Sequence, residues 1–597
     1  MDDKRNIILA AVLTIAILFG WPMIANRFFP PANPPVTKVQ GGKTTPLPQS
    51  GTAAAPAPDS PQAIRDRAIV LRESPRVAID TPKLKGSINL KGARIDDVLL
   101  PTHKETIAKD SPPVRLFSPS GTKDAYFASF AWAGEGVKLP DANSVWTPDR
   151  PTLTPTTPVT LRWDNGAGQR FIMKLSVDQD YMLTVAQTVE NVGTGSVVVR
   201  PYGLISHLGP VTTPSTWTIH TGPIGVFNNA ANYDVNFTNL DGDEPGFFAS
   251  VFGTKAVRGV NSYSTTGGWL GFTDHYWHTA LIPAQNATVQ AQFRGCVTRD
   301  GNTDGCAGDA KRYQADMTYG AVAIAPGKSA TITSRLFVGA KETTVLERYT
   351  DKEGIALFDR AIDWGWFRWF EKPIFYLLDW LFRMIGNFGV AIICLTFIVR
   401  GLMFPVAQRQ FASMAAMRAI QPKMKAIQER YKDDKPKQQQ EIMQLYKSEK
   451  VNPLAGCLPV FLQIPIFFAL YKVLMLTIEM RHQPFILWIK DLSAPDPLHI
   501  LNLFGLLNFT PPAFLGIGVL AVILGITMFL QFRLNPAPMD EMQKQVFSIM
   551  PWMMMFVMAP FAAGLLIYWC TSNILTIAQQ WWLYRQHPVL NQPVAAK

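Results

Sequence analysis

Arg400 is a charged residue inside an otherwise apolar stretch, ICLTFIVRGLMFPVAQRQ (residues 393–410). A stretch of this kind is typical of a membrane-spanning helix. A guanidinium in hydrocarbon costs about 2.5–3.5 kcal/mol on insertion scales, so it usually faces a charged partner or water. Because the predicted spans contain no Asp or Glu, none of them can neutralise Arg400. The sequence therefore predicts a hydrated hollow, open to the cytoplasm, with Arg400 on its wall. The alternative is a shorter span that ends at Arg400.

Other polar side chains are candidates for the same hollow. Thr396 precedes Arg400 by one helical turn on the same face, and Gln463 lies within another span. Asn573 lies in the last span among further polar residues, namely Thr571, Ser572, Thr576, Gln579 and Gln580. Taken singly, such residues are more often hydrogen-bond partners between helices. Together with a hydrated arginine they predict a polar groove.

The inventory of reactive residues argues against an enzyme. None of the eight histidines and no carboxylate lies in a predicted span, which excludes the usual intramembrane serine, aspartyl and metalloproteases. Coupled transport usually needs intramembrane acids as well. The chain lacks zinc-ligand spacing, a P-loop and RNA-binding motifs, so we expect no metal, no cofactor and no sequence-specific nucleic acid partner.

The 597 residues are divided by composition into successive segments. Apolar runs cluster at the N-terminus and in the last third, which predicts six spans, starting with an anchor whose N-terminus is cytoplasmic. A cleaved signal peptide is the alternative for that first run. The predicted segments are an anchor (1–27), a Pro/Ala-rich linker (28–60), a β-sandwich domain (61–345), connecting and amphipathic helices (346–386), a five-span core (387–585) and a short cytoplasmic tail (586–597).

Residues 61–345 show the period-2 pattern of strands. Every second residue from Phe171 to Val177 is apolar, and a turn signal follows at 178–180. Similar alternation in VQAQFRG and in APGKSATITSRLFVG predicts a large all-β domain on the far side of the membrane. Cys296 and Cys306 share one polar loop there, where a local disulfide and two free thiols are both open.

The basic residues set the orientation of the core. Its spans are predicted at about 387–407, 453–476, 514–532, 547–560 and 564–584. The intervening segment 408–450 is strongly basic and therefore cytoplasmic, whereas 477–513 carries only Arg481 and Lys490 as basic residues and is therefore outside. Both chain termini are then cytoplasmic, and the net charge of +11 reflects this distribution rather than binding to nucleic acid.

Segment 408–450 is predicted to form an antiparallel helical hairpin. Its first arm carries Met414, Met417 and Met424, with Lys423 and Lys425 beside them. Methionines suit surfaces that accept varied apolar partners, so these five residues are predicted to form a contact surface. Filling of a core is the equal alternative for the methionines.

The stretch KPIFYLLDWLFRMIGN, before the core, places four polar residues on one helical stripe. They are Lys372, Tyr376, Asp379 and Arg383. This pattern predicts an amphipathic helix that lies flat on the membrane surface, or else a helix packed on protein.

The chain resembles the YidC/Oxa/Alb membrane insertase family over residues 360–585. The resemblance rests on LTFIVRGLMFPVAQRQ, EKVNPLAGCLPVFLQIPIFFALYKVL, FILWIKDLSAPDPLHIL and LIYWCTSNILTIAQQ. It implies a groove enclosed by five spans and closed outside, with Arg400 and Thr396 on its wall. It also implies that Tyr568 and Trp569, at positions where the family often has two tyrosines, line the groove. The anchor and outer domain are similar to the Gram-negative branch, which implies a β-supersandwich.

The expected function is therefore that of a non-enzymatic insertase and chaperone in the bacterial inner membrane. The resemblance implies nascent membrane proteins, the ribosome and targeting machinery, the Sec translocon and the bilayer as partners. Since the tail is short and weakly basic, ribosome contact would depend on the two cytoplasmic loops. An anion-binding transporter or channel is the alternative, and a passive scaffold for the β domain is a third class.

Overall fold

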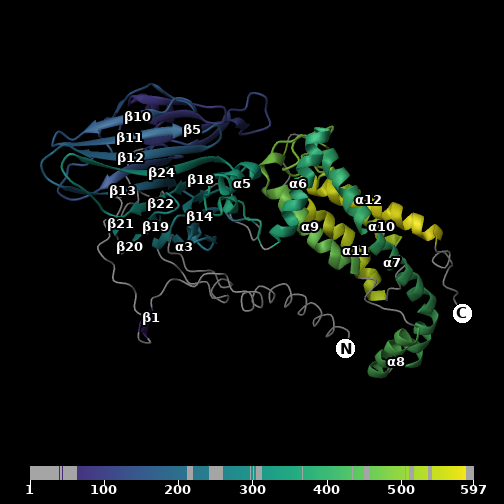
Figure 1. The fold of residues 1–597 in the computed structure, drawn as a ribbon. Helices are drawn as coiled ribbons and strands as arrows, with labels where there is room; N and C mark the ends of the chain where they lie inside the picture. The colour runs from purple at the N-terminus through teal and green to yellow at the C-terminus, as the bar shows by residue number, and fades with distance from the viewer. Residues whose placement is uncertain are drawn as a thin grey trace. The chain divides into compact units, whose positions relative to one another are not determined.

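The chain divides into two compact units, which are described separately (Figure 1). They are a β unit, Met1–Glu105 with Asp110–Asp363, and a helical unit, Thr106–Lys109 with Trp364–Lys597. The computed structural model describes residues 39–40, 43–44, 64–210, 219–240, 260–295, 298–299, 302–303, 312–365, 367–432, 434–449, 458–504, 506–507, 509, 516–534 and 541–586. The predicted anchor, most of the linker, Cys296, Cys306 and the tail from residue 587 lie outside these residues.

The β unit contains a nine-stranded sheet in the order β15-β14-β17-β18-β24-β12-β11-β10-β8. Figure 1 shows β10, β11, β12 and β24 following one another across it. Its strands are β8 (Thr147–Pro148), β10 (Val159–Asp164), β11 (Gln169–Val177), β12 (Met182–Asn191), β14 (Gly222–Phe227), β15 (Ala230–Asn232), β17 (Trp269–Thr273), β18 (Trp277–Ile282) and β24 (Lys328–Ala340).

The second sheet has eleven strands in the order β16-β19-β22-β13-β7-β5-β4-β3-β9, with β23 on β13 and β6 on β5. All its described pairs are antiparallel except β3–β9. Its strands are β3 (Arg76–Asp80), β4 (Lys85–Asn89), β5 (Arg94–Lys104), β6 (Pro113–Phe117), β7 (Tyr126–Ala133), β9 (Thr152–Leu153), β13 (Val197–Leu208), β16 (Val260–Thr266), β19 (Thr288–Gly295), β22 (Arg312–Tyr319) and β23 (Val322–Ile324).

Short elements complete the β unit. Two small ribbons pair β1 (Val39–Gln40) with β2 (Lys43–Thr44) and β20 (Thr298–Arg299) with β21 (Asn302–Thr303). The helical pieces are α2 (Arg67–Arg72), α3 (Phe237–Leu240), α5 (Thr343–Asp351) and the 3-10 turn η1 (Phe358–Ala361).

The period-2 pattern correctly predicts the hairpin of β11 and β12. The alternate residues from Phe171 to Val177 are buried, and Phe171 pairs with Val189 across the hairpin. At the turn, Asp178 Oδ1 accepts hydrogen bonds from the N–H groups of Asp180, at 2.8 Å, and Met182, at 3.0 Å. Such a carboxylate closes the turn and fixes the register of the strands.

Aromatic rings from the two sheets meet in a common core, which makes the β unit a sandwich. Trp132 on β7 and Phe171 on β11 have ring centroids 5.1 Å apart, at 67°. Phe293 on β19 and Phe227 on β14 meet at 6.2 Å. These edge-to-face contacts add to the apolar burial that holds the layers together.

The β unit extends beyond residue 345, where the sequence places its end. Helix α5 buries Val345, Leu346 and Tyr349, and the buried Phe358 of η1 lies 5.1 Å from the ring of Phe337. The helical period begins after the last strand, so the pattern alone assigns these residues to the connection. Their apolar faces nevertheless cover the sandwich, and the unit ends at Asp363.

The helical unit is formed by long helices and one 3-10 turn. These are α6 (Arg368–Ile385), α7 (Phe388–Arg430), α8 (Lys435–Ser448), α9 (Leu458–Leu476), η3 (Ile478–Met480), α10 (Val519–Arg533), α11 (Glu541–Met558) and α12 (Ala563–Gln586). Among the described residues, Phe388–Arg409 is long and apolar enough to cross a membrane. Shorter apolar helices are Gln463–Leu476, Val519–Arg533 and Ser548–Met558.

Helix α7 joins the predicted first core span to the first arm of the hairpin. It begins at Asn387, whose side chain accepts a hydrogen bond from the N–H of Val390, and it continues through Pro405 and Pro422. The 43-residue helix therefore holds Arg400 and the basic first arm on one continuous element. Helix α8 follows as the second arm of the hairpin expected for residues 408–450.

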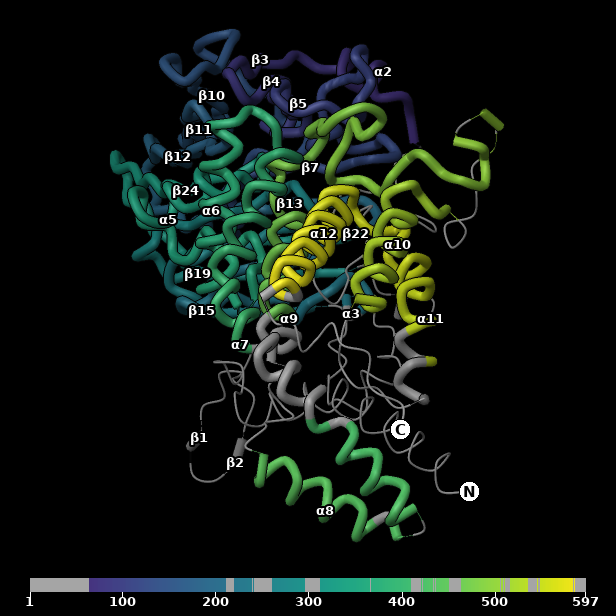
Figure 2. Tube along the Cα trace, turned by 90° about the vertical axis from the view of Figure 1, so that its right-hand side faces the viewer, coloured from purple at the N-terminus to yellow at the C-terminus, as the bar shows by residue number. Residues whose placement is uncertain are grey.

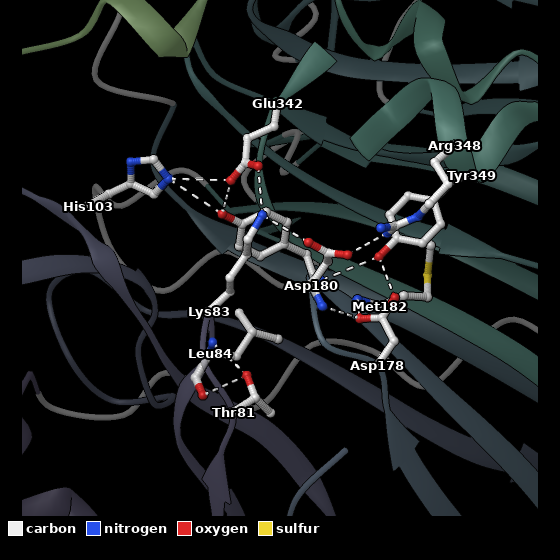
Figure 3. A network of polar contacts seen from close by, with 11 residues as sticks. Thr81, Lys83, Leu84, His103, Asp178, Asp180, Met182, Glu342, Arg348 and Tyr349 are labelled. Carbon is white, nitrogen blue, oxygen red and sulfur yellow. Dashed lines mark hydrogen bonds and ion pairs between the residues drawn. The ribbon is translucent and has the colours of Figure 1, made fainter. Parts of the chain in front are cut away.

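A polar network links three segments of the β unit (Figure 3). Lys83 Nζ contacts Asp180 at 2.8 Å and Glu342 at 2.6 Å. Burial raises the pKa of Glu342, but hydrogen bonds from His103, Lys83 and Tyr181 outweigh it and lower the pKa to about 2. The ionised carboxylate is therefore more stable in the folded state than in the unfolded state.

We expect this carboxylate to make the β unit sensitive to acid. The ordinary pKa of the group is 4.5 and the folded value is about 2. The unfolded state therefore binds more protons between these values. The contribution of Glu342, on the order of 2–3 kcal/mol, is present above about pH 4.5 and lost as the pH falls toward 2. Glu342→Gln should flatten this part of the pH profile of the unfolding midpoint of the full chain.

The exposed Glu135→Gln variant is the control for that profile. It should follow the unsubstituted protein at each pH. If Glu342→Gln and the unsubstituted protein lose stability in parallel as the pH falls, the acid sensitivity does not come from Glu342.

Candidate functional site

Arg400 is held by a hydroxyl group of another helix. Its Nε donates to Ser572 Oγ at 3.0 Å, and its Nη2 donates to the same oxygen. Arg400 lies on α7 and Ser572 on α12, two helices that pack together. Within the described part of the chain, Arg400 makes no ion pair with a carboxylate. The guanidinium therefore keeps donors that water or a bound anionic group could occupy, since it has five N–H groups.

A second polar contact lies one helical turn away on α12. Gln463 Nε2, on α9, donates to the hydroxyl of Tyr568 at 2.7 Å. Tyr568 and Ser572 are four residues apart, so they share one face of α12. Arg400 of α7 and Gln463 of α9 thus reach this face of α12, which carries Tyr568, from two different helices.

The remaining predicted residues of the last span face other neighbours. Asn573 is buried and its Nδ2 donates to Thr527 Oγ1 of α10 at 3.2 Å. The Trp569 ring packs on Phe467 of α9, with centroids 5.0 Å apart. Both contacts join α12 to its neighbours, which is the common use of such side chains between packed helices.

Thr396 is fully buried, and its hydroxyl donates to the Ile392 carbonyl of its own helix at 2.7 Å. It precedes Arg400 by one turn but is enclosed by neighbouring helices. A hydroxyl satisfied by the i−4 carbonyl contributes little polarity to its surroundings.

Ser572 is the partner of Arg400 that sequence reasoning failed to single out. It was one of several polar residues in the span, and only the rotation of α12 against α7 selects it. Its spacing of four from Tyr568 was the available signal. Among the residues described, no group of His, Cys, Asp and Glu side chains is arranged to hold a metal ion.

The connection between α9 and α10 covers the ends at which α7, α10 and α12 begin. Asn387 Nδ2 donates to the Phe485 carbonyl at 3.0 Å, next to the first turn of α7. The N–H groups of Ala563 and Gly564, at the start of α12, donate to the Ala494 and Leu492 carbonyls at 2.8 and 3.0 Å. The free N–H groups at the start of α12 are thus satisfied by this loop, whereas the start of α7 is capped by Asn387 and tied to the loop through its side chain.

Asp496 fixes this loop to α10. Its buried carboxylate accepts hydrogen bonds from Trp488 Nε1 and from the N–H groups of Leu498 and Leu520, at 3.0, 3.0 and 2.8 Å. Gly518, which precedes α10, has no side chain to cap the helix, and a Cβ there would lie 2.6 Å from Asp496 Cβ. Asp496 therefore supplies the cap from elsewhere in the loop, where its charge also suits the helix N-terminus.

The hairpin arms contact each other near the predicted contact residues. Lys423 Nζ pairs with Glu449 at 2.6 Å, and the hydroxyl of Tyr446 lies 3.4 Å from Met424 Sδ. Lys425 is exposed. The backbone of Met414 and Met417 belongs to α7, while their side chains lie outside the described part.

Helix α6 exposes aromatic side chains, including Trp369, Tyr376 and Trp380, and buries Phe375 and Leu378 on its opposite side. Within the predicted polar stripe, Asp379 and Arg383 form an ion pair at 2.8 Å. Exposed aromatics beside charged residues suit a membrane interface.

Comparison with known proteins decides the family. Residues 380–590 match the family model described as "60Kd inner membrane protein", and residues 76–377 match "YidC periplasmic domain". Membrane protein insertase YidC of Zymomonas mobilis subsp. mobilis is 48% identical over 591 residues, covering 98% of this chain and 96% of that protein. The corresponding protein of Methylobacterium nodulans is 44% identical over 603 residues, covering 98% and 96%.

The chain belongs to the YidC family of membrane protein insertases. The β unit is the periplasmic domain of this family, and the helical unit belongs to the inner membrane. YidC insertases act without a chemical reaction, so the chain is not an enzyme.

Two solved structures are also similar to the chain. The "Active YidC insertase crystal structure with the first transmembrane domain resolved" is 17% identical and covers 85% of this chain and 92% of that one, with a TM-score of 0.34. A galactose mutarotase related enzyme from Lactobacillus acidophilus is 12% identical and covers 44% and 97%, with a TM-score of 0.28. Both scores are too low to support an argument about the fold.

Ser572→Ala should destabilise the helical unit through Arg400. Losing a hydrogen bond to a charged group costs about 1.5–3 kcal/mol. The same substitution in an Arg400→Ala background should cost much less, because the partner is already absent. Thermal unfolding of all four proteins in detergent measures the coupling. Equal losses in both backgrounds would contradict it. Thr576→Ala is the matched control, since this hydroxyl donates to the Ser572 carbonyl at 2.7 Å.

Asp496→Asn should loosen the start of α10. The amide nitrogen would face an N–H donor that now binds a carboxylate oxygen. The lost hydrogen bond should lower the free energy of unfolding by about 2–3 kcal/mol. Hydrogen exchange of the first turn of α10 should become faster, whereas exposed Lys490→Gln on the same loop should leave it unchanged. Unchanged exchange in Asp496→Asn would show that the other contacts of the loop are sufficient.

Proposed function

We propose that the chain inserts, folds and helps to assemble inner-membrane proteins through a hydrated, positively charged groove open to the cytoplasm and lipid. The observation that carries the proposal is the state of Arg400. Its guanidinium contacts the hydroxyl of Ser572, with no carboxylate partner among the described residues. A charge held in this way remains able to attract an acidic group.

Transfer of a client then needs no chemical energy source. The basic hairpin receives the client, and Arg400 attracts acidic groups in its polar flank. Water and the polar side chains of Arg400, Gln463 and Tyr568 lower the cost of moving that flank partway across. Passage of the apolar segment into lipid gains about 25 cal/mol per Å² buried and drives release.

The proposed topology has six spans, of which five enclose the groove, with both termini in the cytoplasm. The basic hairpin supports this orientation, because basic loops remain on the cytoplasmic side. The α9–α10 loop then lies at the periplasmic end, where its contacts with α7, α10 and α12 support closure of the groove. The ribosome and targeting machinery are proposed partners at the hairpin, through Met414, Met417, Lys423, Met424 and Lys425. The Sec translocon is a further proposed partner.

An anion transporter or channel is the second candidate, since Arg400 could bind an anion instead of a client. Reconstituted vesicles separate the two functions. Insertion of a small single-span protein without an added energy source supports the insertase. Saturable anion flux without insertion would overturn it. A scaffold function would instead require most of residues 61–345, whereas an insertase should tolerate loss of much of this domain.

Arg400 variants test the attraction directly. Arg400→Lys should retain part of the activity, because its charge remains but the forked donors are lost. Arg400→Ala should retain less, and Arg400→Glu least, because it repels acidic flanks. Complementation of insertase-depleted cells measures all three, with protein levels checked by immunoblot. Equal complementation by Arg400→Glu and by the unsubstituted protein would disprove the proposed attraction between Arg400 and acidic groups of the client.

A further inference from the structure

The loop between α9 and α10 exposes an apolar face at the surface of the helical unit. The face comprises Leu501, Leu503, Phe504, Leu506, Leu507 and Phe509, all exposed. Leu506 is 84% exposed, and Leu487, earlier in the same loop, is 80% exposed. Figure 2 shows the yellow-green chain before α10 projecting from this end of the helical unit. Contiguous exposed side chains of this size mark an interaction surface.

We propose that this loop face inserts among the acyl chains of the periplasmic leaflet. Composition favours lipid over a protein partner. Residues 497–532, which follow Asp496 and run through α10 to Phe532, contain no Asp, Glu, Lys or Arg. The charge of α10 is confined to Arg533 at its far end. A protein interface would ordinarily place polar and charged residues around its apolar centre. The inference requires the proposed membrane placement of α7 and α10 but not insertion activity.

The position of the loop agrees with this occupant. Its contacts with Asn387, Ala563 and Leu520 attach it at the ends of three helices that enter the membrane. Asn387 also directly follows α6, whose exposed Trp369 and Trp380 suit the same interface. The loop is thereby held at the depth where the hydrocarbon begins.

Several backbone N–H groups of the loop are already hydrogen-bonded within it. The N–H groups of Leu503, Phe504 and Leu507 donate to the carbonyls of Ile500, His499 and Asn502, at 3.0, 2.9 and 3.0 Å. The N–H of Ile500 donates to Ile517 at 3.1 Å, across the two sides of the loop. Unsatisfied backbone groups are costly in hydrocarbon, so these internal bonds remove a main obstacle to insertion.

Depth-dependent quenching tests the proposal in the full-length chain. An environment-sensitive fluorophore is attached to Leu506→Cys in a variant whose five native cysteines are replaced, and the protein is reconstituted in vesicles. Ile526→Cys, exposed on α10, is the lipid-facing reference, and exposed Lys490→Cys is the aqueous reference. We expect doxyl-labelled lipids to quench the label at 506 as strongly as the label at 526, and iodide to quench only the label at 490.

The other outcomes each have a definite meaning. Iodide quenching at 506 equal to that at 490 would overturn the proposal in favour of a water-exposed loop. Protection at 506 from both quenchers would overturn it in favour of a second copy of the chain. Failure of the lipid quencher at 526 would instead count against the proposed membrane placement itself.

A second measurement avoids replacing the cysteines. Leu506→Cys and Lys490→Cys are made in the otherwise unaltered chain and treated with a membrane-impermeant maleimide in vesicles. Site occupancy is then determined by peptide mass spectrometry. We expect strong labelling at 490 and little at 506 until the vesicles are dissolved in denaturant. Equal labelling at both sites would overturn the proposal.

Discussion

A guanidinium inside a helical bundle needs hydrogen-bond acceptors or water around it, because leaving its five N–H groups and its charge without partners is costly. In this chain the described partner of Arg400 is a hydroxyl, that of Ser572. A carboxylate would form a closed ion pair, with little remaining attraction for a client. A hydroxyl satisfies the geometry of the guanidinium and leaves its charge uncompensated. The packing of α7 on α12, and the position of Tyr568 and Gln463 beside them, serve to hold this charge in place.

A second constraint applies at the end of the helical unit where the α9–α10 loop lies. Helices that begin together expose several N–H groups, and the α9–α10 loop supplies carbonyls and the Asp496 carboxylate to them. One end of the bundle is therefore tied by several backbone and carboxylate hydrogen bonds, whereas the Arg400 guanidinium is bound to a neutral hydroxyl. The β unit is separate in its construction, with an aromatic core and a polar network around Lys83 and Glu342.

Local pattern predicted the elements better than the contacts between them. The alternation in β11 and β12 is a property of consecutive residues, so it was readable, as was the helical hairpin after Arg400. The partner of Arg400 could not be read from the sequence, because Ser572 is 172 positions away and the rotation of α12 decides which of its polar residues faces Arg400. Thr396 shared the periodicity of the groove face, yet neighbouring helices enclose it. The end of the β unit at Asp363 was missed because α5 is helical in sequence but covers the sandwich.

The continuity of α7 has a mechanical consequence. Pro405 lacks an N–H, so the Gly401 carbonyl loses its helical partner, and neither Gly401 nor Pro405 is enclosed by other side chains. Bending of a long helix concentrates at such a turn. This point lies one turn beyond Arg400, between the guanidinium and the hairpin. A change in the angle between the hairpin and the first part of α7 would therefore occur beyond Arg400 and would leave its contact with Ser572 on α12 in place.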